Sequence, residues 1–292
     1  MAFLRFAAFA SFVLLLSLLT PLASAQLQLT YTIVDAPGDV STYITGINNN
    51  GILSGYYGGA TTSANFTWNN GTFSYFNVPG EVYSQANGIN DSNQVVGYYS
   101  PDGTNRIGFV YDGSNFTYFQ YPNVQYTQPY GINNAGLIVG AEDPASGAWT
   151  GLLYDGTTFH TFQVSSSNYT FAYGVNNLND VVGQENTASY YQGFLRRDGK
   201  NKLIAPPGAN FSGATGINDN GIIVGSFTTL TTHSECFVWK NGKFNTFFIP
   251  NVENTYCIAI NNSGALVGYV SDFGMHIAHG FYTSPVTDAD FK

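Results

Sequence analysis

The residues that could support acid–base or metal chemistry are few, and they lie toward the C-terminal end of the sequence. His233 and Glu235 are separated by a single residue, and His276 and His279 follow further along the chain. An imidazole titrates near neutral pH, so a set of imidazoles beside a carboxylate could act as a general acid and base or bind a metal ion. Ordinary surface histidines would give the same pattern, because no fixed ligand spacing joins these residues. They are candidate catalytic residues in competition with that simpler interpretation.

The sequence contains no motif that marks a known catalytic class. It lacks the GxSxG elbow of serine hydrolases, the HExxH helix of metallopeptidases, the phosphate-binding P-loop and a GxGxxG dinucleotide motif in a helix-forming context. Two carboxylates could still pair across a surface as glycosidases require, but sequence spacing does not reveal such a pair. We therefore expect no cofactor and no metal ion, and we favour a non-enzymatic role. A polysaccharide lyase or glycoside hydrolase is the alternative.

A second set of residues has the chemistry to bind sugars. Aromatic rings cover the apolar faces of sugar rings, and carboxylates accept hydrogen bonds from hydroxyl groups. Acidic and aromatic residues gather in long segments that differ from one part of the chain to the next, and among the basic residues only Arg106 joins them. The competing interpretation is that roughly half of these rings pack inside the protein. The candidate ligand-binding residues are Tyr57, Glu81, Tyr99, Asp102, Tyr130, Glu142, Asp143, Trp149, Glu185 and Tyr191.

These residues are positioned by a motif that the sequence repeats. GINNNGILSGYY, which begins at Gly46, returns in altered form at steps of 42 or 43 residues. Asn and Gly in its centre favour a tight turn between two short strands, because both tolerate positive φ. A calcium loop would need more carboxylates than most copies contain, so we interpret the motif as scaffold. The copies begin at Gly46, Gly88, Gly131, Gly174, Gly216 and Ala259.

Each repeat predicts four short β-strands. The strand after the turn carries two apolar residues before a glycine, as in Val95-Val96-Gly97, which indicates burial on both faces. An aromatic or apolar pair marks the third strand, and a second Gly-containing turn leads to the fourth. A four-stranded sheet that recurs with this period is typical of a propeller blade, whereas the coils of a β-solenoid are shorter and lack such hairpins. The long connections would then share one face, where variable loops on a rigid frame usually bind ligands.

The ends of the repeat array predict how the ring closes. Residues 29–37, LTYTIVDAP, have the pattern of a fourth strand, and the last repeat stops after its third strand at residues 280–283. The N-terminal segment is expected to complete the last blade, which removes two exposed sheet edges. We predict an all-β, six-bladed β-propeller with four strands per blade over residues 26–284, followed by a short acidic tail at residues 285–292.

The reiterated GIN-x-x-G-x-I/V-V-G segments, each followed by an aromatic-rich strand, resemble those of the HAF-type extracellular repeat family of bacterial secreted proteins. The resemblance extends over residues 29–283. Three of the six repeats have Gly-Phe in place of the Ala-Phe of the His-Ala-Phe step that names the family, as in Gly108-Phe109 and Gly193-Phe194, and His279-Gly280-Phe281 alone keeps a histidine. The resemblance implies an exported repeat protein and brings no established activity.

The sequence begins with a predicted secretory signal peptide, residues 1–25. Arg5 precedes an apolar run, and small residues before position 26 provide a cleavage site. The run is short for a membrane span, so we expect a protein that is secreted, extracellular or periplasmic, with no span after cleavage. Export would also permit a disulfide between Cys236 and Cys257.

Charge excludes one class of partner. Acidic residues outnumber basic ones by 18 to 9, and nucleic-acid-binding proteins need a basic surface. The sequence therefore predicts a secreted, monomeric recognition module whose partner is an extracellular polysaccharide or protein. Carbohydrate binding is favoured over a protein-interaction platform.

Overall fold

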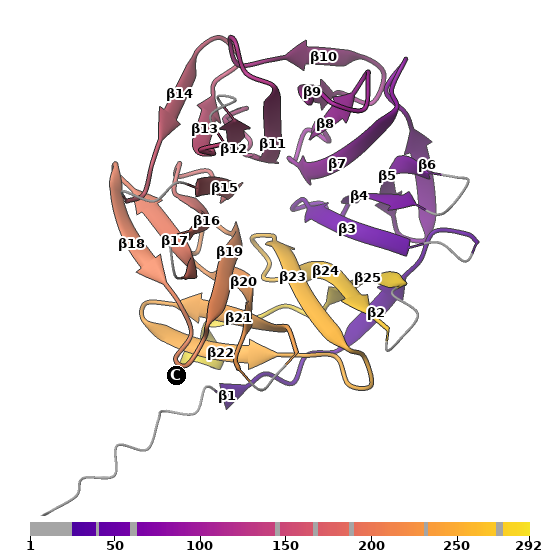
Figure 1. Cartoon of the computed structure of the whole chain (residues 1–292). Helices are drawn as coiled ribbons and strands as arrows, with labels where there is room; N and C mark the ends of the chain where they lie inside the picture. Colours follow the sequence, from indigo (N-terminus) through magenta and orange to yellow (C-terminus); the bar gives the residue numbers. More distant parts are fainter. Residues whose placement is uncertain are drawn as a thin grey trace, which may run out of the picture.

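Six blades, each of four antiparallel strands, surround a central axis (Figure 1). Blades four and five are also joined into one sheet by a parallel pairing of Tyr191 with Phe211. The computed structural model describes residues 25–38, 41–58, 63–143, 147–165, 169–186, 190–230, 233–272 and 277–292. Blades one to three contain β3 (Ser41–Ile47), β4 (Leu53–Gly58), β5 (Ser63–Asn69), β6 (Thr72–Phe76); β7 (Tyr83–Ile89), β8 (Val95–Ser100), β9 (Ile107–Tyr111), β10 (Phe116–Phe119); and β11 (Tyr126–Ile132), β12 (Ile138–Asp143), β13 (Thr150–Tyr154), β14 (Phe159–Phe162). Blades four to six contain β15 (Tyr169–Val175), β16 (Val181–Asn186), β17 (Tyr191–Arg197), β18 (Lys200–Ile204); β19 (Phe211–Ile217), β20 (Ile223–Thr228), β21 (Glu235–Lys240), β22 (Lys243–Phe247); and β23 (Asn254–Ile260), β24 (Leu266–Ser271), β25 (Ala278–Thr283), β2 (Tyr31–Val34). The predicted six-bladed propeller is confirmed.

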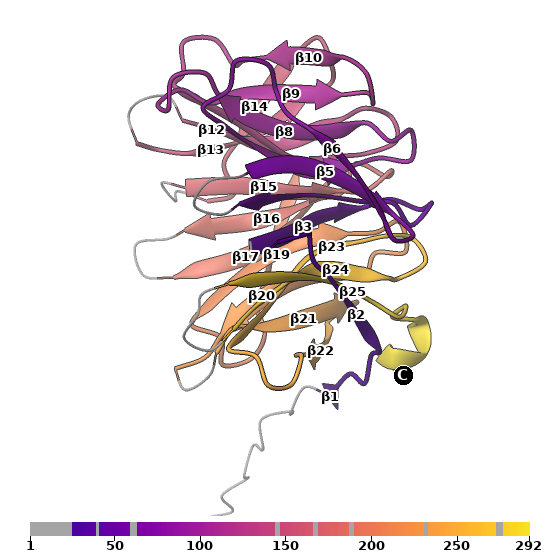
Figure 2. The same ribbon diagram turned by 90° about the vertical axis from the view of Figure 1, so that its right-hand side faces the viewer.

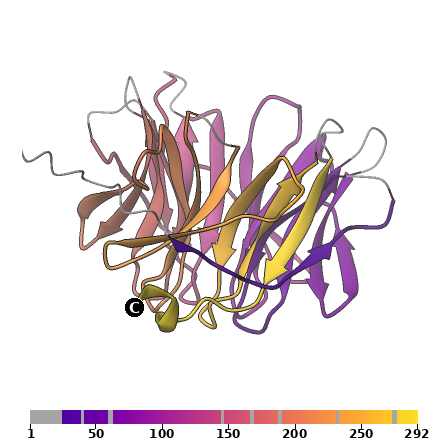
Figure 3. The same ribbon diagram turned by 90° about the horizontal axis from the view of Figure 1, so that it is seen from below.

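The first strand of every repeat lies innermost in its blade, and the fourth lies outermost (Figure 1). Two side views show the strands standing along the axis, so the connections gather at two opposite faces (Figures 2 and 3). We call the face with the turns between first and second strands the turn face; it includes residues 48–52 and their equivalents. The opposite face, with the longer connections between second and third strands, is called the loop face.

The last blade is completed by the N-terminal strand. β2 pairs antiparallel with β25, with Tyr31 opposite Thr283 and Val34 opposite Gly280. This pairing confirms the closure that the sequence predicts, and it leaves the third strand of blade six with a partner on each side.

Two segments pack on blade five in addition to its own strands. β1 (Ala25–Gln26) pairs in parallel with β22, and a short 3-10 helix η1 (Asp288–Phe291) contacts the same strand. Lys240 forms an ion pair with Asp288 at 2.5 Å. The predicted acidic tail therefore includes a helix that packs against the ring. Of the predicted signal peptide, all residues except Ala25 lie outside the described ranges.

A disulfide joins blade five to blade six. Cys236 in β21 and Cys257 in β23 are bonded, with their Cα atoms 5.3 Å apart. Disulfides persist in oxidising compartments, so this bond agrees with an exported protein. Within the part of the chain that the structure describes, no helix has the length and apolar character of a membrane span.

The glycine that ends the apolar pair of each second strand is required by close packing. A Cβ atom on Gly183 would lie 1.9 Å from the carbonyl oxygen of Phe171 and 2.7 Å from the ring of Phe194. At all six equivalent glycines a Cβ would lie 1.8–2.2 Å from a backbone carbonyl oxygen of the first strand, and at four of them it would also meet the ring of a third-strand phenylalanine. A large third-strand side chain fills the centre of every blade. These side chains are completely buried: Phe66, Phe109, Leu152, Phe194, Phe237 and Phe281.

The turn face is held together by one asparagine from each blade. In blade five, Oδ1 of Asn218 accepts hydrogen bonds from the backbone N–H groups of Asn220 and Ile222, at 3.1 and 3.0 Å. Its Nδ2 donates to the backbone carbonyl of Asn261, the equivalent residue of the next blade, at 3.0 Å. Aspartate lacks this donor, and glutamine is one methylene longer. The same bond from blade to blade closes a ring of buried side chains: Asn48, Asn90, Asn133, Asn176, Asn218 and Asn261.

A second ring lies one residue further along the motif. The backbone N–H of each member donates to the side-chain Oδ1 of its equivalent in the next blade, at 2.7–2.9 Å. Asp91 and Asp219 take opposite places in the ring, and Oδ2 of each also accepts from the side-chain amides of both neighbouring asparagines. The repeated motif is therefore scaffold, as its turn chemistry predicts. The members are Asn49, Asp91, Asn134, Asn177, Asp219 and Asn262.

We predict that Asn218→Ala destabilises the protein strongly. The change removes three hydrogen bonds and leaves buried backbone groups unpaired, which costs about 2–4 kcal/mol of unfolding free energy. Urea denaturation of the mature protein measures this loss. Asn220→Ala in the same turn is the matched control, because Asn220 is exposed and its amide makes one bond to Asn262. Equal stabilities of the two variants would contradict the role of the ring.

The second ring predicts a pH dependence centred on Asp91. Burial opposes ionisation of this carboxylate, but hydrogen bonds from Asn49 and Asn134 outweigh it and lower the pKa. A carboxylate whose pKa is lower in the folded state stabilises the fold above its unfolded pKa of about 3.9, and this contribution is lost as pH falls through the folded pKa. We expect the stability difference between the protein and Asp91→Asn to shrink as pH is lowered below about 4.

Unfolding free energies at neutral and acidic pH test this expectation. The control is Asp198→Asn, which changes an exposed carboxylate outside both rings. If the unfolding free energies of the protein and Asp91→Asn differed by the same amount at every pH, the carboxylate charge would not stabilise the ring.

Candidate functional site

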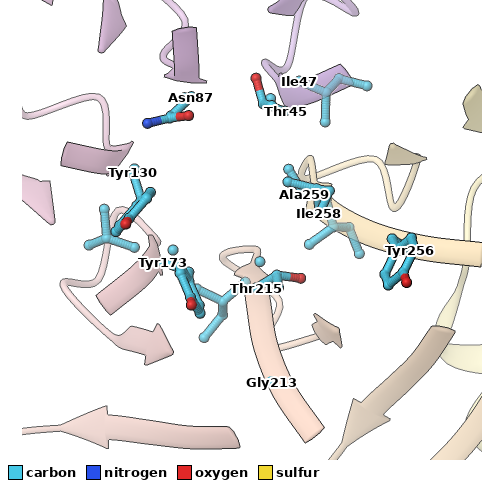
Figure 4. A pocket seen from close by; sticks show the side chains of 18 of the residues that line it. Thr45, Ile47, Asn87, Tyr130, Tyr173, Gly213, Thr215, Tyr256, Ile258 and Ala259 are labelled. Atoms are coloured by element: carbon cyan, nitrogen blue, oxygen red, sulfur yellow. The ribbon is translucent and has the colours of Figure 1, made fainter. Parts of the chain in front are cut away.

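The inner strands enclose a cavity of about 400 Å³ on the axis of the propeller. Residues from every blade line it, as the close view shows (Figure 4). Toward the turn face its wall ends in a collar of aliphatic side chains, beyond which lies a small polar cavity of about 70 Å³ bordered by the two asparagine rings. The larger cavity therefore lies between the collar and the loop face. The collar consists of Ile47, Ile89, Ile132, Val175, Ile217 and Ile260.

β-Bulges direct one extra side chain of every inner strand toward this cavity. The register of each inner strand shifts by one residue just before the glycine that opens the motif. A bulge adds an unpaired residue and changes where its side chain points. Thr45, Asn87 and Thr215 at this position donate to a backbone carbonyl of the next blade, at 2.7, 2.7 and 2.8 Å. The other blades place larger side chains there, namely Tyr130, Tyr173 and Ile258 (Figure 4).

Most of the aromatic wall consists of tyrosines whose hydroxyl groups are available to a ligand. Burial raises the pKa of Tyr173, and burial with help from Tyr256 and Tyr43 raises that of Tyr269 to about 12. Both hydroxyls therefore stay protonated and can donate hydrogen bonds. No described residue hydrogen-bonds to the hydroxyl groups of Tyr56, Tyr173, Tyr256 and Tyr269.

The wall of the cavity is uncharged. Among its described lining residues there is no Asp, Glu, His, Lys or Arg. General acid–base catalysis needs a group that titrates near the working pH, and the raised tyrosine pKa values do not provide one. What the wall offers is aromatic faces together with neutral hydroxyl and amide groups, which suits binding of a neutral polar molecule.

The structure places the predicted aromatic residues in several different environments. Tyr130 lines the cavity. Tyr57 and Tyr99 face outward along their blades. Their rings lie beside those of Tyr75 and Tyr118, with ring centres 5.5 and 5.1 Å apart. These two are therefore not brought to the axis.

Trp149 and Tyr191 lie near the cavity without lining it. The Trp149 ring lies tilted against Phe171, with 5.3 Å between ring centres, and Phe171 stacks on Tyr173 with 6.0 Å between ring centres. Tyr191 is 44% exposed and contacts Phe211, a lining residue, at 5.3 Å. Both rings extend the aromatic wall away from the axis.

The predicted acidic residues are mostly engaged within the protein. Glu142, Asp143 and Glu185 are buried, and the Glu185 carboxylate accepts a hydrogen bond from Ser165 at 2.6 Å. Burial raises the pKa of Glu142, despite a hydrogen bond from Thr150. Three of the carboxylates predicted to form an acidic binding face are therefore covered by the protein.

Glu81 and Asp102 stabilise connections between strands. Glu81 accepts a hydrogen bond from the backbone N–H of Val78 at 3.1 Å. Asp102 accepts from the backbone N–H groups of Thr104 and Asn105 at 2.8 and 2.7 Å, which lowers the pKa of its carboxyl. These contacts explain both residues as turn-forming side chains.

The candidate catalytic residues are only partly described. His279 hydrogen-bonds to Asp35 and Asp272, at 2.9 and 3.1 Å. Burial lowers the pKa of His279, but both carboxylates raise it and the net shift is upward. Burial raises the pKa of Glu235. His276 lies outside the described ranges, so the acid–base or metal-binding hypothesis stays a prediction.

No group of three or more described His, Cys, Asp or Glu side chains is placed to hold one metal ion. His233, the fourth candidate, is exposed.

Sequence reasoning overlooked most of the cavity wall. Aligning the repeats on their opening glycine leaves the preceding residue variable, and this variation is the signal that could have found the site. Strand alternation alone would place that residue on a sheet face. The bulge that turns this residue toward the axis follows from the packing of neighbouring inner strands. No residue type in the sequence marks its position. The residues concerned are Thr45, Asn87, Tyr130, Tyr173, Thr215 and Ile258.

Several solved structures share the architecture. The gluconolactonase XC5397 from Xanthomonas campestris has a TM-score of 0.56 at 10% identity, over 91% of this chain and 92% of that chain. The lectin SapL1, solved with α-methyl fucoside, has a TM-score of 0.55 at 10% identity, over 86% and 93%. The six-bladed fucose-binding lectin of Aleuria aurantia has a TM-score of 0.50 at 9% identity, over 85% and 96%.

At such low identity these likenesses show a shared propeller fold. No protein-family model and no curated protein sequence matches this chain. The resemblance to the HAF-type repeat family therefore stays a prediction from the sequence motifs.

Proposed function

We propose that this protein is a secreted, monomeric, non-enzymatic carbohydrate-binding protein that receives its ligand in the axial cavity. The mature protein would comprise the propeller, residues 26–284, and the tail, residues 285–292. The observation that carries the proposal is the uncharged tyrosine wall with unpaired hydroxyl groups. The fold shared with lectins and the motif resemblance to an exported repeat family agree with it.

The chemistry of the wall suits a sugar. Aromatic faces cover the apolar side of a sugar ring, and neutral hydroxyl and amide groups pair with its hydroxyls. The cavity volume of about 400 Å³ falls within the range of small-molecule sites. Because the aliphatic collar and asparagine rings border its turn-face end, the cavity suits a short saccharide or the end of a longer chain.

Aromatic contacts extend from the cavity toward the surface and provide a path for the rest of such a chain. Tyr191 continues the wall from Phe211, and Trp149 continues it from Phe171. Among the ligand-binding residues predicted from the sequence, we assign direct contact to Tyr130 and peripheral contact to Trp149 and Tyr191.

A glycan array with the mature protein tests the proposal, followed by calorimetry on the best ligand with Tyr173→Phe. This change removes a hydroxyl that has no hydrogen-bond partner among the described residues. We therefore expect unchanged thermal stability and a loss of affinity of about five- to tenfold, the value of one hydrogen bond. The control is Tyr118→Phe on the outer strand of blade two, where the ring is 44% exposed.

The proposal fails if the array binds no glycan. Undiminished affinity in Tyr173→Phe would place the ligand outside the cavity and contradict the assignment of the site.

A further inference from the structure

Arg106 is an unpaired cation at the junction of blades two and three. The chain has 18 acidic residues against 9 basic ones, yet no carboxylate lies within ion-pairing distance of Arg106 among the described residues. Asp102, the closest acid in the sequence, uses its oxygens for hydrogen bonds within its own loop. A guanidinium without a counter-ion in an acidic protein calls for another acceptor.

The side chain is held in a fixed position by tyrosines. Nε donates to the hydroxyl of Tyr83 at 3.0 Å, and the guanidinium lies over the rings of Tyr98 and Tyr126, 5.3 and 5.1 Å from their centres. The backbone of Arg106 also pairs with Tyr126 of the next blade. These contacts use one of five N–H donors, and the two terminal amino groups have no acceptor in the described protein.

A second unpaired donor belongs to the same junction. Gln128 is 3% exposed, and its Oε1 accepts a hydrogen bond from the Tyr130 hydroxyl. Its Nε2 is buried and has no hydrogen-bond partner among the described residues, although burial of an unpaired donor is unfavourable. The unpaired groups of Arg106 and Gln128 are therefore both donors, and both require an acceptor.

The junction adjoins the axial cavity. Tyr130 lines the cavity and hydrogen-bonds to Gln128. The positive charge of Arg106 also acts on Tyr130, where it opposes the stronger effect of burial on the pKa. Tyr130, Gln128 and Tyr126, whose ring lies under Arg106, all belong to β11. This strand therefore connects the cavity wall to Arg106.

We propose that the junction of blades two and three binds the carboxylate of an acidic sugar, with Arg106 as the principal contact and Gln128 as a supporting donor. The inference rests on the carbohydrate-binding function proposed above and specifies its substrate class as a saccharide that contains a uronic acid. The planar guanidinium matches a carboxylate in geometry as well as in charge. The described lining of the cavity includes no cation for this group, so Arg106 determines the preference for acidic over neutral sugar.

Calorimetry with two matched pairs of oligosaccharides tests the inference, one of galacturonic acid and galactose and the other of glucuronic acid and glucose. We expect the mature protein to bind the acidic member of at least one pair about ten- to a hundredfold more tightly, as a charged hydrogen bond provides. Arg106→Gln should abolish this preference and leave affinity for the neutral sugar unchanged. Arg106→Lys, which keeps the charge without the planar fork, should restore it in part.

The control is Arg196→Gln, because Arg196 also lies over an aromatic ring, Phe162 at 4.6 Å, but belongs to blade four. An Arg106→Gln variant that loses thermal stability and neutral-sugar affinity together would indicate a structural role and overturn the inference. Binding of neutral and acidic sugars with equal affinity would also overturn it while leaving carbohydrate binding intact. Failure to bind any sugar would defeat the proposed function itself.

Discussion

A closed circle of side-chain amides at the turn face fixes the six blades relative to one another. Hydrogen bonds within a blade fix its strands but say nothing about where the next blade lies. Each asparagine makes both kinds of contact. Its side-chain oxygen accepts hydrogen bonds within its own turn, and its side-chain nitrogen donates to the turn of the next blade. The inner strands must then lie so close that a Cβ on Gly88 would be 3.1 Å from the Cα of Gly131. The asparagine two residues later therefore requires a glycine at this position of the motif, because its hydrogen bond brings the inner strands this close.

This division of roles leaves the cavity wall free to differ between blades. The rings fix the inner strands at the turn face, and three residues before each ring asparagine the bulge turns one side chain per blade toward the axis. Threonine or asparagine at that position adds a further bond between blades, whereas Tyr130 and Tyr173 give up that bond and present rings to the cavity. Binding chemistry can therefore vary at this position while the scaffold residues remain the same.

The sequence predicts the fold well because its signals are periodic and local. Val95-Val96-Gly97 and the displaced strand around Tyr31 indicated the blade and its closure. The site was less accessible, because exposure depends on neighbouring blades. Glu185 looked like a surface acid and is 2% exposed, and the cavity residue Tyr173 depends on a bulge. The pairing of β1 with blade five likewise has too few residues to leave a pattern.

The amides of the ring all donate in the same rotational sense, so every blade offers its neighbour the same donor and the same acceptor. The asparagine ring therefore accepts any repeat at any position, and it does not specify the order of the repeats. What does depend on order is the set of side chains that meet at each junction, such as Arg106 of one repeat with Tyr126 of the next. Permuting whole repeats would therefore bring different side chains together at each junction, while the asparagine ring keeps its hydrogen bonds. Recognition can change in this way by recombination of existing repeats, without a new fold.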